Sequence, residues 1–555
     1  MDEIIRKYAL QNAVKFNGKA NPGAVIGKII AERPELKSDM KKIAKKVNEI
    51  IKKVNSLSPE EQKKELQEKA PELLEKKKEK ERNIFEFLGF KETDKVNTAF
   101  PPGPEKYPHI GHAKALLLNY MLAKQYNGKF ILRFEDTNPT LVKKEFYDIM
   151  IDNFKWLGVE WDELLYASDF MELFYEKAEL LIKKGLAYVD KSNEGEVKKS
   201  REKGIPSEYR NNSPEENLKL WKEMQKAKPG SAIVRLKIDL KHKNTTMRDP
   251  TILRIIDEPH AKQGKKYRIW PNYDFQNAIM DSYSNIDIRL RSKEFEMRSE
   301  LQRWIQKNLG IKETKTYEFG RFNMTGVLSS GRVIREKIKN KELLGWDDPS
   351  LTTIVALRRR GFLPQAIKNF VISTGISKAE ATTTWDDLMI QNKRLLDNIA
   401  SRYSAVFDGA EVSIENAPTM EVELNLNPNE KKGGRKCKVN DKFILSKKDL
   451  ESIKENELVR LMDCINIQKK GKKVSFISNK YEDFKGKGEK IINWLPAQGN
   501  INIEVLMPDK TIMKGLAEHN TKSLEESIVI QFERFGFCRL DKKEKDKLKF
   551  WFTHK

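Results

Sequence analysis

Cysteine is scarce in this chain of 555 residues, which has three. Cys437, Cys464 and Cys538 lie too far apart along the sequence to build a disulfide framework or a structural zinc site, so we expect small buried residues. An apolar run of about 18 residues, which a membrane-spanning helix needs, is also missing. The first residues carry charges where a secretory signal would need an apolar core. These absences predict a cytoplasmic protein without a membrane segment, disulfides or structural zinc.

Acidic residues are outnumbered by basic ones. The chain has 105 lysines and arginines against 82 aspartates and glutamates, which gives a net charge of +23 and an isoelectric point near 9.4. Such an excess favours an acidic polymer, RNA or DNA, as the partner. The alternative explanation for the charge is a surface rich in lysine and glutamate that keeps the protein soluble or stable at high temperature. The charge by itself leaves both explanations open.

The hydrophobic pattern changes along the chain, and this predicts several domains. Before residue 90, apolar residues recur at helical spacing, as in Ile43, Val47 and Ile50, while the mixed-charge run at 75–82 is typical of a solvated helix face. Strand and helix patterns alternate from about residue 91 onward, which is typical of a parallel sheet covered by helices. Beyond about residue 405, short strands separated by turn residues predict barrels or sandwiches.

Histidine is scarce as well, with six in the chain, yet two of them lie three positions apart at His109 and His112. The preceding Pro-Pro-Gly-Pro segment at 101–104 cannot be helical, whereas residues 113–124 are rich in strong helix formers. The pair therefore lies where a loop becomes a helix, and a helix start offers unpaired N–H groups and partial positive charge to a phosphate. Gly111 leaves room for a flat ring beside the backbone. The alternative is two ordinary polar residues at a helix start.

Two strands are expected to end at one site. The histidine loop follows a strand expected over 96–100, and Glu135 follows a second strand expected over 130–134. Ligands of parallel sheets bind at the carboxyl ends of the strands. We therefore expect the histidines and Glu135 to border the same cavity.

Many segments, in a consistent order along the chain, resemble the class I aminoacyl-tRNA synthetases of the glutamyl/glutaminyl branch, and most of all the archaeal glutamyl-tRNA synthetases. These segments are residues 12–14, 21–27, 100–113, 132–139, 156–162, 273–275, 290–294, 357–361, 494–496, 504–509 and 531–536. The resemblance implies that glutamate and ATP, with Mg²⁺, give glutamyl-adenylate and pyrophosphate, usually with tRNA already bound. The glutamyl group then passes to the 2′-hydroxyl of the terminal adenosine of tRNA(Glu). Whether tRNA(Gln) is charged as well stays open.

The resemblance implies an α/β protein of six parts. They are a helical N-terminal extension (1–90), the first half of a Rossmann-like catalytic domain (91–190), an inserted acceptor-stem-binding region (191–268), the second half of the catalytic domain with a KMSKS-like loop (269–345), a helical connecting region (346–405) and β-barrel anticodon-binding domains (406–555).

The resemblance also assigns roles to single residues. Its ATP-binding positions are Pro102, Gly103, His109, Gly111, His112, Ser329, Ser330, Gly331 and Arg332, of which His109, His112 and Arg332 are expected to be catalytic. Its glutamate-binding positions are Glu135, Tyr273, Asn277 and Arg291. Physically, the first step is an attack by a carboxylate on the α-phosphate, so it needs charge stabilisation and positioning more than a nucleophilic side chain.

Two of these glutamate-binding positions have a simpler alternative. Glu135 is expected to hold the ammonium group of the substrate, and its alternative is an ordinary loop carboxylate. Arg291 could form a bidentate pair with a carboxylate, and its alternative is a salt bridge to Asp287 or Glu294.

Two positions depart from the family pattern. Ala99 stands where the family has an arginine that binds the side-chain carboxylate of the substrate, which makes Arg291 the leading candidate for that charge. Ser330 stands where a lysine of the KMSKS-like loop neutralises pyrophosphate. Gly331 keeps this loop mobile, and Arg332 is our candidate for the work of the lysine.

Arg358, Arg359 and Arg360 form a dense basic spot, which we expect to contact tRNA phosphates, with helix capping or internal salt bridges as the alternative. Two other functions stay open. One is a glutaminyl-tRNA synthetase, which shares most of the segments. The other is a tRNA-binding paralogue that has lost catalysis, supported only by Ala99 and Ser330. The N-terminal segments favour glutamate, and a monomer is the default expectation.

Overall fold

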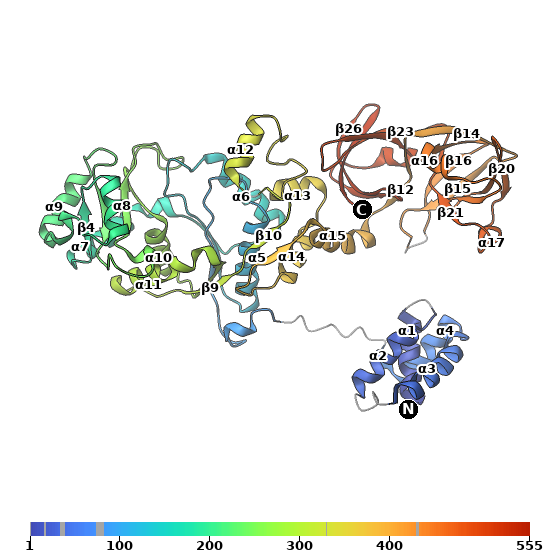
Figure 1. The fold of residues 1–555 in the computed structure, drawn as a ribbon, viewed down its shortest axis with the longest axis horizontal. Helices are drawn as coiled ribbons and strands as arrows, with labels where there is room; N and C mark the ends of the chain where they lie inside the picture. The colour runs from blue at the N-terminus through green and yellow to red at the C-terminus, as the bar shows by residue number, and fades with distance from the viewer. Residues whose placement is uncertain (1, 16–17, 34–38, 74–82, 329, 429–431) are drawn as a thin grey trace. The chain divides into compact units, whose positions relative to one another are not determined.

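The computed structural model describes residues 2–15, 18–33, 39–73, 83–328, 330–428 and 432–555, and the charged run at 75–82 lies outside them. The chain forms two compact units, Met1–Glu86 and Phe87–Lys555. Each unit has its own core, and Figure 1 shows the elements of both. Within the described ranges, no helix is both long and apolar enough to cross a membrane.

The first unit consists of helices, as its apolar spacing predicts. They are α1 (Asp2–Lys15), α2 (Pro22–Glu32), α3 (Met40–Asn55) and α4 (Pro59–Lys69), which share one apolar core. Ser58 begins α4 with a reciprocal capping box, since its hydroxyl accepts from the Glu61 N–H and the Glu61 carboxylate accepts from the Ser58 N–H. The side-chain amide of the fully buried Gln62 donates to the backbone carbonyls of Gly18, Val54 and Leu57. These carbonyls lie at or just beyond helix ends, where the regular helical hydrogen bonds stop.

A parallel sheet with helices packed on it forms the centre of the second unit. Its strands are β1 (Thr98–Phe100), β2 (Phe130–Phe134), β3 (Glu163–Tyr166), β8 (Ile288–Ser292) and β9 (Lys315–Phe319), and its helices are α5 (Ile110–Gln125), α6 (Lys144–Trp156), α7 (Met171–Lys183), α10 (Tyr273–Tyr283) and α11 (Glu296–Leu309). The pairs β1–β2, β2–β3 and β8–β9 are parallel. β8 lies beside β1, because the Asp287 N–H donates to the Asn97 carbonyl at 3.0 Å. The predicted α/β fold class is confirmed.

Residues between β3 and β8 form a second, antiparallel sheet. Its strands are β4 (Ala187–Asp190), β5 (Ile233–Leu236), β6 (Thr251–Ile255) and β7 (Ile269–Pro271), accompanied by α8 (Glu194–Lys203) and α9 (Pro214–Met224). Buried residues of this sheet share a core with α7, α10 and α11. The last strand, β7, leads directly into α10, so the sheet is tied to the site described below.

The region after residue 345 is mostly helical, with α13 (Ile354–Arg360), α14 (Pro364–Ser373) and α15 (Trp385–Ile399). One short strand was not expected there: β11 (Ala381–Thr383) pairs with β10 (Phe322–Met324). Its threonines favour an extended backbone, and β10 offers it a partner from a distant part of the chain.

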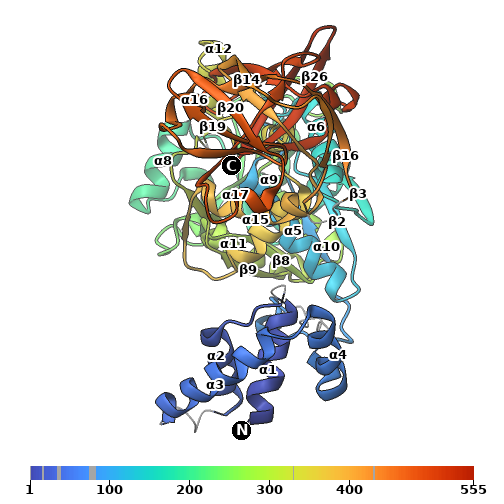
Figure 2. The ribbon, with the colours of Figure 1, turned by 90° about the vertical axis from the view of Figure 1, so that its right-hand side faces the viewer.

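The C-terminal region is built of strands, as predicted, and forms two seven-stranded half-barrel sheets (Figure 1 and Figure 2). One has the order β12-β25-β26-β27-β23-β24-β13 and the other β21-β18-β19-β20-β14-β17-β22. The strands are β12 (Arg402–Tyr403), β13 (Ala405–Phe407), β14 (Gly409–Glu415), β15 (Met420–Asn425), β16 (Gly434–Val439), β17 (Lys442–Ser446), β18 (Leu458–Leu461), β19 (Asn466–Lys470), β20 (Lys473–Ser478), β21 (Lys490–Ile492), β22 (Leu495–Pro496), β23 (Ile501–Leu506), β24 (Ile512–Ala517), β25 (Val529–Phe532), β26 (Gly536–Glu544) and β27 (Lys547–His554). Cys437, Cys464 and Cys538 are buried in these cores as free thiols, as expected.

Candidate active site

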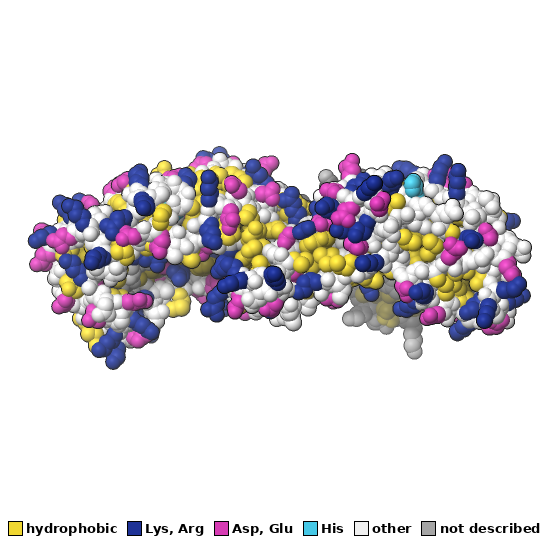
Figure 3. All heavy atoms as spheres, turned by 90° about the horizontal axis from the view of Figure 1, so that it is seen from above, with side chains coloured by type: hydrophobic (Ala, Val, Ile, Leu, Met, Phe, Trp, Pro, Cys, Tyr) yellow, Lys and Arg dark blue, Asp and Glu magenta, His cyan; other side chains and the backbone are white. Residues whose placement is uncertain are grey.

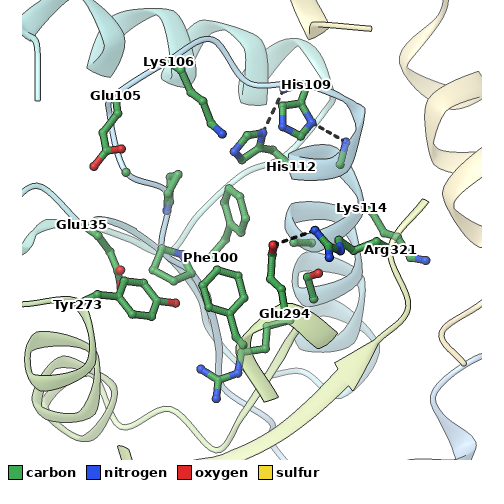
Figure 4. Close-up of a pocket in the computed structure, with 18 of the residues that line it drawn as sticks. Phe100, Glu105, Lys106, His109, His112, Lys114, Glu135, Tyr273, Glu294 and Arg321 are labelled. Carbon is green, nitrogen blue, oxygen red and sulfur yellow. Dashed lines mark hydrogen bonds and ion pairs between the residues drawn. The ribbon is translucent and has the colours of Figure 1, made fainter. Parts of the chain in front are cut away.

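A cavity of about 950 Å³ lies at the carboxyl ends of β1, β2 and β8 (Figure 4). This is where parallel sheets bind their ligands. Eight of the residues that the sequence assigned to ATP or glutamate line it: Pro102, Gly103, His109, Gly111, His112, Glu135, Tyr273 and Arg291. The fold therefore gathers segments that are distant in the chain, from Phe100 to Thr352, around one space.

His109 and His112 are fixed by reciprocal hydrogen bonds at the start of α5. His109 is the N-cap, and its Nδ1 accepts from the Gly111 N–H at 3.1 Å. Nδ1 of His112 accepts in turn from the His109 N–H at 3.2 Å, which brings the two ring centroids to 4.0 Å. Because each Nδ1 is an acceptor, each neutral ring carries its proton on Nε2. Both rings thus keep one N–H that they can donate to a ligand.

Neither ring is charged at neutral pH. Burial, together with the nearby Lys106 ammonium, lowers the pKa of His109 to about 4. Burial, the His109 ring and Lys106 hold the pKa of His112 well below its usual value. The pair can therefore donate hydrogen bonds to a phosphate but adds no net charge beside it.

The histidine loop is held in place from the helical region. The Ile110 N–H donates to the Thr352 carbonyl at 3.0 Å, and the Ile354 N–H donates to the Pro108 carbonyl at 2.9 Å. The Tyr107 ring stacks on Trp346 with centroids 5.1 Å apart. The loop is consequently rigid on the side away from the cavity.

Glu135 presents an unpaired carboxylate oxygen. Its backbone N–H donates to the Pro102 carbonyl at 2.9 Å, which joins the loops after β1 and β2. Its Oε1 accepts from Arg133 at 3.3 Å, while Oε2 is buried and has no protein partner. Burial raises the pKa of Glu135 to about 7, against the opposing charges of Arg133 and Arg289. An ammonium group placed at Oε2 would supply the missing partner and favour the ionised form.

Two arginines behind and beside Glu135 share one pair of acceptors. Arg133 donates to Asp281 Oδ1 at 2.8 Å and to Asn277 Oδ1 at 3.0 Å. Arg289 donates to Asp281 Oδ2 at 3.0 Å and also to Asn277. Arg289 lines the cavity, whereas Arg133, Asn277 and Asp281 lie behind its wall. Asn277, an expected glutamate-binding residue, is buried and does not line the cavity, and its side chain accepts from both guanidinium groups.

Arg291 and Tyr273 form another part of the wall. Arg291 Nη1 donates to Gln302 at 2.9 Å, Nη2 donates to Ser299, and Nε lies 3.7 Å from Glu318. Asp287 and Glu294, the partners considered from sequence, are instead paired with Lys312 and Arg321, respectively. The Tyr273 ring stacks on Phe295 at 5.5 Å, and burial raises the pKa of its hydroxyl to about 12.

Residues 95–398 match the family "tRNA synthetases class I (E and Q), catalytic domain", and residues 400–484 and 491–541 match its two "anti-codon binding domain" models. The chain belongs to this class I tRNA synthetase family. The synthetase is 41% identical to the glutamate–tRNA ligase of Pyrococcus furiosus and 40% identical to that of Pyrococcus abyssi, with 100% of both chains covered in each comparison. A solved structure of a glutamate tRNA ligase from Elizabethkingia meningosepticum in complex with its amino acid aligns with 55% of this chain and 70% of that chain, at 18% identity and a TM-score of 0.42.

Within the KMSKS-like loop of the synthetase (327–333), Val327 lines the large cavity. Ser330 is the N-cap of α12 (Gly331–Lys339), and Ser329 lies outside the described residues. Arg332 is exposed in the first turn of α12. Ser330, Gly331 and Arg332 do not line the cavity, although Gly331 borders a small adjoining crevice with Lys106 and His109.

The basic spot of the synthetase makes mostly internal contacts. Arg359 pairs with Asp347 and Asp541, and Arg360 is buried and donates to the carbonyls of Pro349 and Thr553. Arg358 is half-exposed and pairs with Asp152 at 2.7 Å. On the face seen in Figure 3, lysine and arginine side chains are interspersed with acidic ones. The side chains of Arg358 and Arg359 are 42% and 39% exposed, whereas Arg360 is buried.

Two cavity residues of the synthetase were missed from sequence. Arg289 stands two positions before Arg291, and the period of two along a strand places both on one face, so the alternation could have identified it. Lys106 stands in the histidine loop, but nothing in the sequence tells which way a loop side chain points. Its direction into the cavity comes from the loop geometry alone.

Proposed function

We propose that this synthetase activates glutamate with ATP and transfers the glutamyl group to the 3′-terminal adenosine of tRNA(Glu). The observation that carries the proposal is the cavity itself, where two imidazole N–H donors at a helix start face a wall of buried arginines and an unpaired carboxylate. The relatives, which carry the name glutamate–tRNA ligase over their full length, support the same reaction.

In the first step, the α-carboxylate oxygen of glutamate attacks the α-phosphorus of ATP. The bond to the β-phosphate oxygen breaks, and pyrophosphate leaves with the electron pair. His109 and His112 donate from Nε2 to the phosphates, and the α5 N-terminus adds its partial positive charge. The absence of a side chain at Gly111 leaves room for the His109 ring, which keeps its Nε2 donor in position.

In the second step, the 2′-hydroxyl of the terminal adenosine attacks the acyl carbon and AMP leaves. No side chain has to act as a nucleophile in either step, so positioning supplies most of the acceleration. The rigid histidine loop and the buried arginine cluster provide that positioning for the two substrates.

Recognition of glutamate divides between a carboxylate and two guanidinium groups. The free Oε2 of Glu135 receives the ammonium group. Arg289 and Arg291 neutralise the side-chain carboxylate, with the Tyr273 hydroxyl beside them. Both arginines are more than nine-tenths buried, and Asp281 is shared between Arg289 and Arg133, so a substrate carboxylate adds a negative charge that an uncharged substrate carboxamide would not supply. This arrangement favours glutamate over glutamine.

Mg²⁺ enters with ATP. Among the described residues there is no group of three or more His, Cys, Asp or Glu side chains that could hold a metal ion. Mg²⁺ is usually held by substrate phosphates and one or two carboxylates, so the residues fit an ion that is carried by ATP rather than caged by the protein. When bound, the ion would add positive charge to the phosphates.

The test is glutamate-dependent ATP–pyrophosphate exchange with tRNA present, run beside the same assay with glutamine. Charging of purified tRNA(Glu) and tRNA(Gln) with each amino acid then defines the second substrate. Exchange with glutamate and none with glutamine supports the proposal. Exchange with glutamine alone would mean that the enzyme is a glutaminyl-tRNA synthetase. No exchange with either amino acid would mean that the protein binds tRNA without catalysing activation. We further propose that the synthetase acts in the cytoplasm as a monomer on tRNA(Glu) and, if charging shows it, on tRNA(Gln).

A further inference from the structure

The phosphate end of the cavity is short of positive charge. A bound triphosphate carries several negative charges, and His109 and His112 are neutral donors. Most cations in the wall already have partners in the protein. Lys114 donates to the Gly320 carbonyl at 3.0 Å and lies over the Phe322 ring, and burial lowers its pKa to about 8. The paired arginines are Arg289 with Asp281, Arg291 with Glu318, Arg298 with Asp274 and Arg321 with Glu294.

Lys106 is different from these cations. It lines the cavity and the adjoining crevice, and its ammonium has no hydrogen bond or ion pair to any residue that the structure describes. Figure 4 shows its side chain extending from the histidine loop towards His112. Its charge contributes to the low pKa of both His109 and His112, which places it within electrostatic reach of the two rings. Arg254, a second unpaired cation of the wall, belongs to the inserted sheet instead.

The stem of Lys106 also faces the KMSKS-like loop. A Cβ built on Gly331 would lie 3.5 Å from Lys106 Cδ, so the two backbones approach within the length of one lysine stem. Gly331 follows Ser330, the position where the sequence lacks a pyrophosphate-binding lysine. Arg332, the replacement expected from sequence, is exposed and does not line the cavity. Lys106 can therefore supply the positive charge that a lysine at position 330 would have supplied. It does so from the histidine loop rather than from the KMSKS-like loop.

We propose that Lys106 is the residue that neutralises the β- and γ-phosphates of ATP in this synthetase, in place of the lysine missing at Ser330. As the bond between the α-phosphorus and the bridging oxygen breaks, the electron pair moves onto pyrophosphate, and the Lys106 ammonium lies beside the charge that develops. This inference rests on the proposed ATP-dependent activation of an amino acid, but not on which amino acid is used.

The experiment compares the full-length wild type with Lys106→Ala, Lys106→Arg and Arg332→Ala in tRNA-dependent ATP–pyrophosphate exchange. Loss of a charged donor to the transferring phosphates should lower kcat/KM for ATP by about 100-fold in Lys106→Ala, with the KM for the amino acid unchanged. Lys106→Arg should keep most of the activity, and any loss in Arg332→Ala should be smaller than the loss in Lys106→Ala. Lys95→Ala, at an exposed lysine outside the cavity wall, is the matched control.

A second-site change separates a chemical role from a structural one. Ser330→Lys in the Lys106→Ala background should restore much of the lost exchange, because it returns a cation from the other side. Binding of ATP with Mg²⁺, measured by equilibrium dialysis, gives a reading that needs no amino acid. Lys106→Ala should weaken this binding.

The inference is overturned if Lys106→Ala binds ATP and exchanges pyrophosphate as the wild type does, or if Arg332→Ala alone shows the loss. It is also overturned if Ser330→Lys restores nothing in a Lys106→Ala protein whose thermal unfolding matches the wild type. If the wild type binds ATP but does not activate glutamate, the proposed substrate is refuted. ATP binding by the wild type and by Lys106→Ala would then decide whether Lys106 contacts the phosphates.

Discussion

Arg133 and Arg289 donate to the same two side chains, Asn277 and Asp281, from strands that lie on either side of β1. Ala99 in β1 pairs with Ile131, two residues before Arg133, so all three side chains point to one face of the sheet. Ala99 itself is fully buried in an apolar cluster with Ile131 and Ile286. Arg289, on the neighbouring strand β8, lines the cavity, and we propose that it supplies the positive charge that the resemblance expects from β1.

Asp281 should be essential for stability. Burial would raise its pKa, but Arg289 and Arg133 hold it below the usual value, so it is the ionised partner of two buried cations. Asp281→Asn would leave both arginines uncompensated and should lower the free energy of unfolding by about 3–5 kcal/mol. Chemical denaturation measures this. Glu163→Gln, which breaks the exposed pair with Lys129, should cost no more than about 1 kcal/mol. Equal losses in the two variants would contradict this account.

Arg289→Ala should weaken glutamate binding rather than ATP binding. Loss of one charged hydrogen-bond donor should raise the KM for glutamate by about 10- to 100-fold and reduce the preference for glutamate over glutamine. The double variant Ala99→Arg, Arg289→Ala returns a guanidinium to the same face and should recover part of the affinity. Steady-state kinetics with both amino acids decides this. If the double variant recovers no glutamate affinity, Arg289 serves only to hold Asp281 in place and the prediction is contradicted.

Gly111→Ala should disturb catalysis without lowering stability. A Cβ at Gly111 would lie 2.9 Å from His109 Cε1, so the ring has to move. Displacement of the donor should lower kcat/KM for ATP by about 10- to 100-fold, whereas alanine inside a helix is favourable by up to about 1 kcal/mol. The control is Gly27→Ala in α2, where a Cβ meets nothing within 4 Å. A loss of activity with an equal loss of melting temperature would point to misfolding instead.

Glu135 should link activity and stability to pH in opposite senses. Its folded-state pKa of about 7 lies above the usual 4.5, so the ionised form that binds ammonium is lost below pH 7 and the KM for glutamate should rise there. The same shift costs stability as the pH rises from 4.5 through 7, because the unfolded chain ionises first. Glu135→Gln should therefore abolish activation yet raise stability at pH 8, by no more than about 3 kcal/mol, with no gain near pH 4. Denaturation curves at both pH values test this, and a variant that is less stable at pH 8 would contradict it.

Arg358 and Arg360 should differ in what they affect. Arg358→Ala removes a half-exposed cation, so it should weaken tRNA binding and reduce the slope of log K against log salt by about one, with little change in stability. Arg360→Ala leaves the Pro349 and Thr553 carbonyls unsatisfied and should cost about 1–3 kcal/mol of stability. Filter binding at several salt concentrations and thermal unfolding measure the two effects. A salt slope unchanged in Arg358→Ala would remove this residue from the tRNA interface.

Part of the site could be predicted from the sequence, because it depends on residues that are close together in the chain. Prolines before the histidine pair and helix formers after it place His109 at the start of α5, and the structure puts it there as N-cap. The strand that ends at Phe134 likewise carries Glu135 to the cavity edge, because parallel strands deliver their carboxyl ends to one place. These features depend on neighbours within one turn or one strand.

What the sequence by itself determined is the order of helices and strands, the loop-to-helix position of the histidines and the membership of Glu135, Tyr273 and Arg291 in one site. The tertiary structure alone decided that the imidazoles are neutral, that Asn277 accepts hydrogen bonds from Arg133 and Arg289 behind the cavity wall, and that Arg289 and Lys106 line the cavity. The reason is physical: burial and through-space charges set a pKa and choose a partner, and both depend on residues that are distant in the chain and become neighbours only in the folded protein.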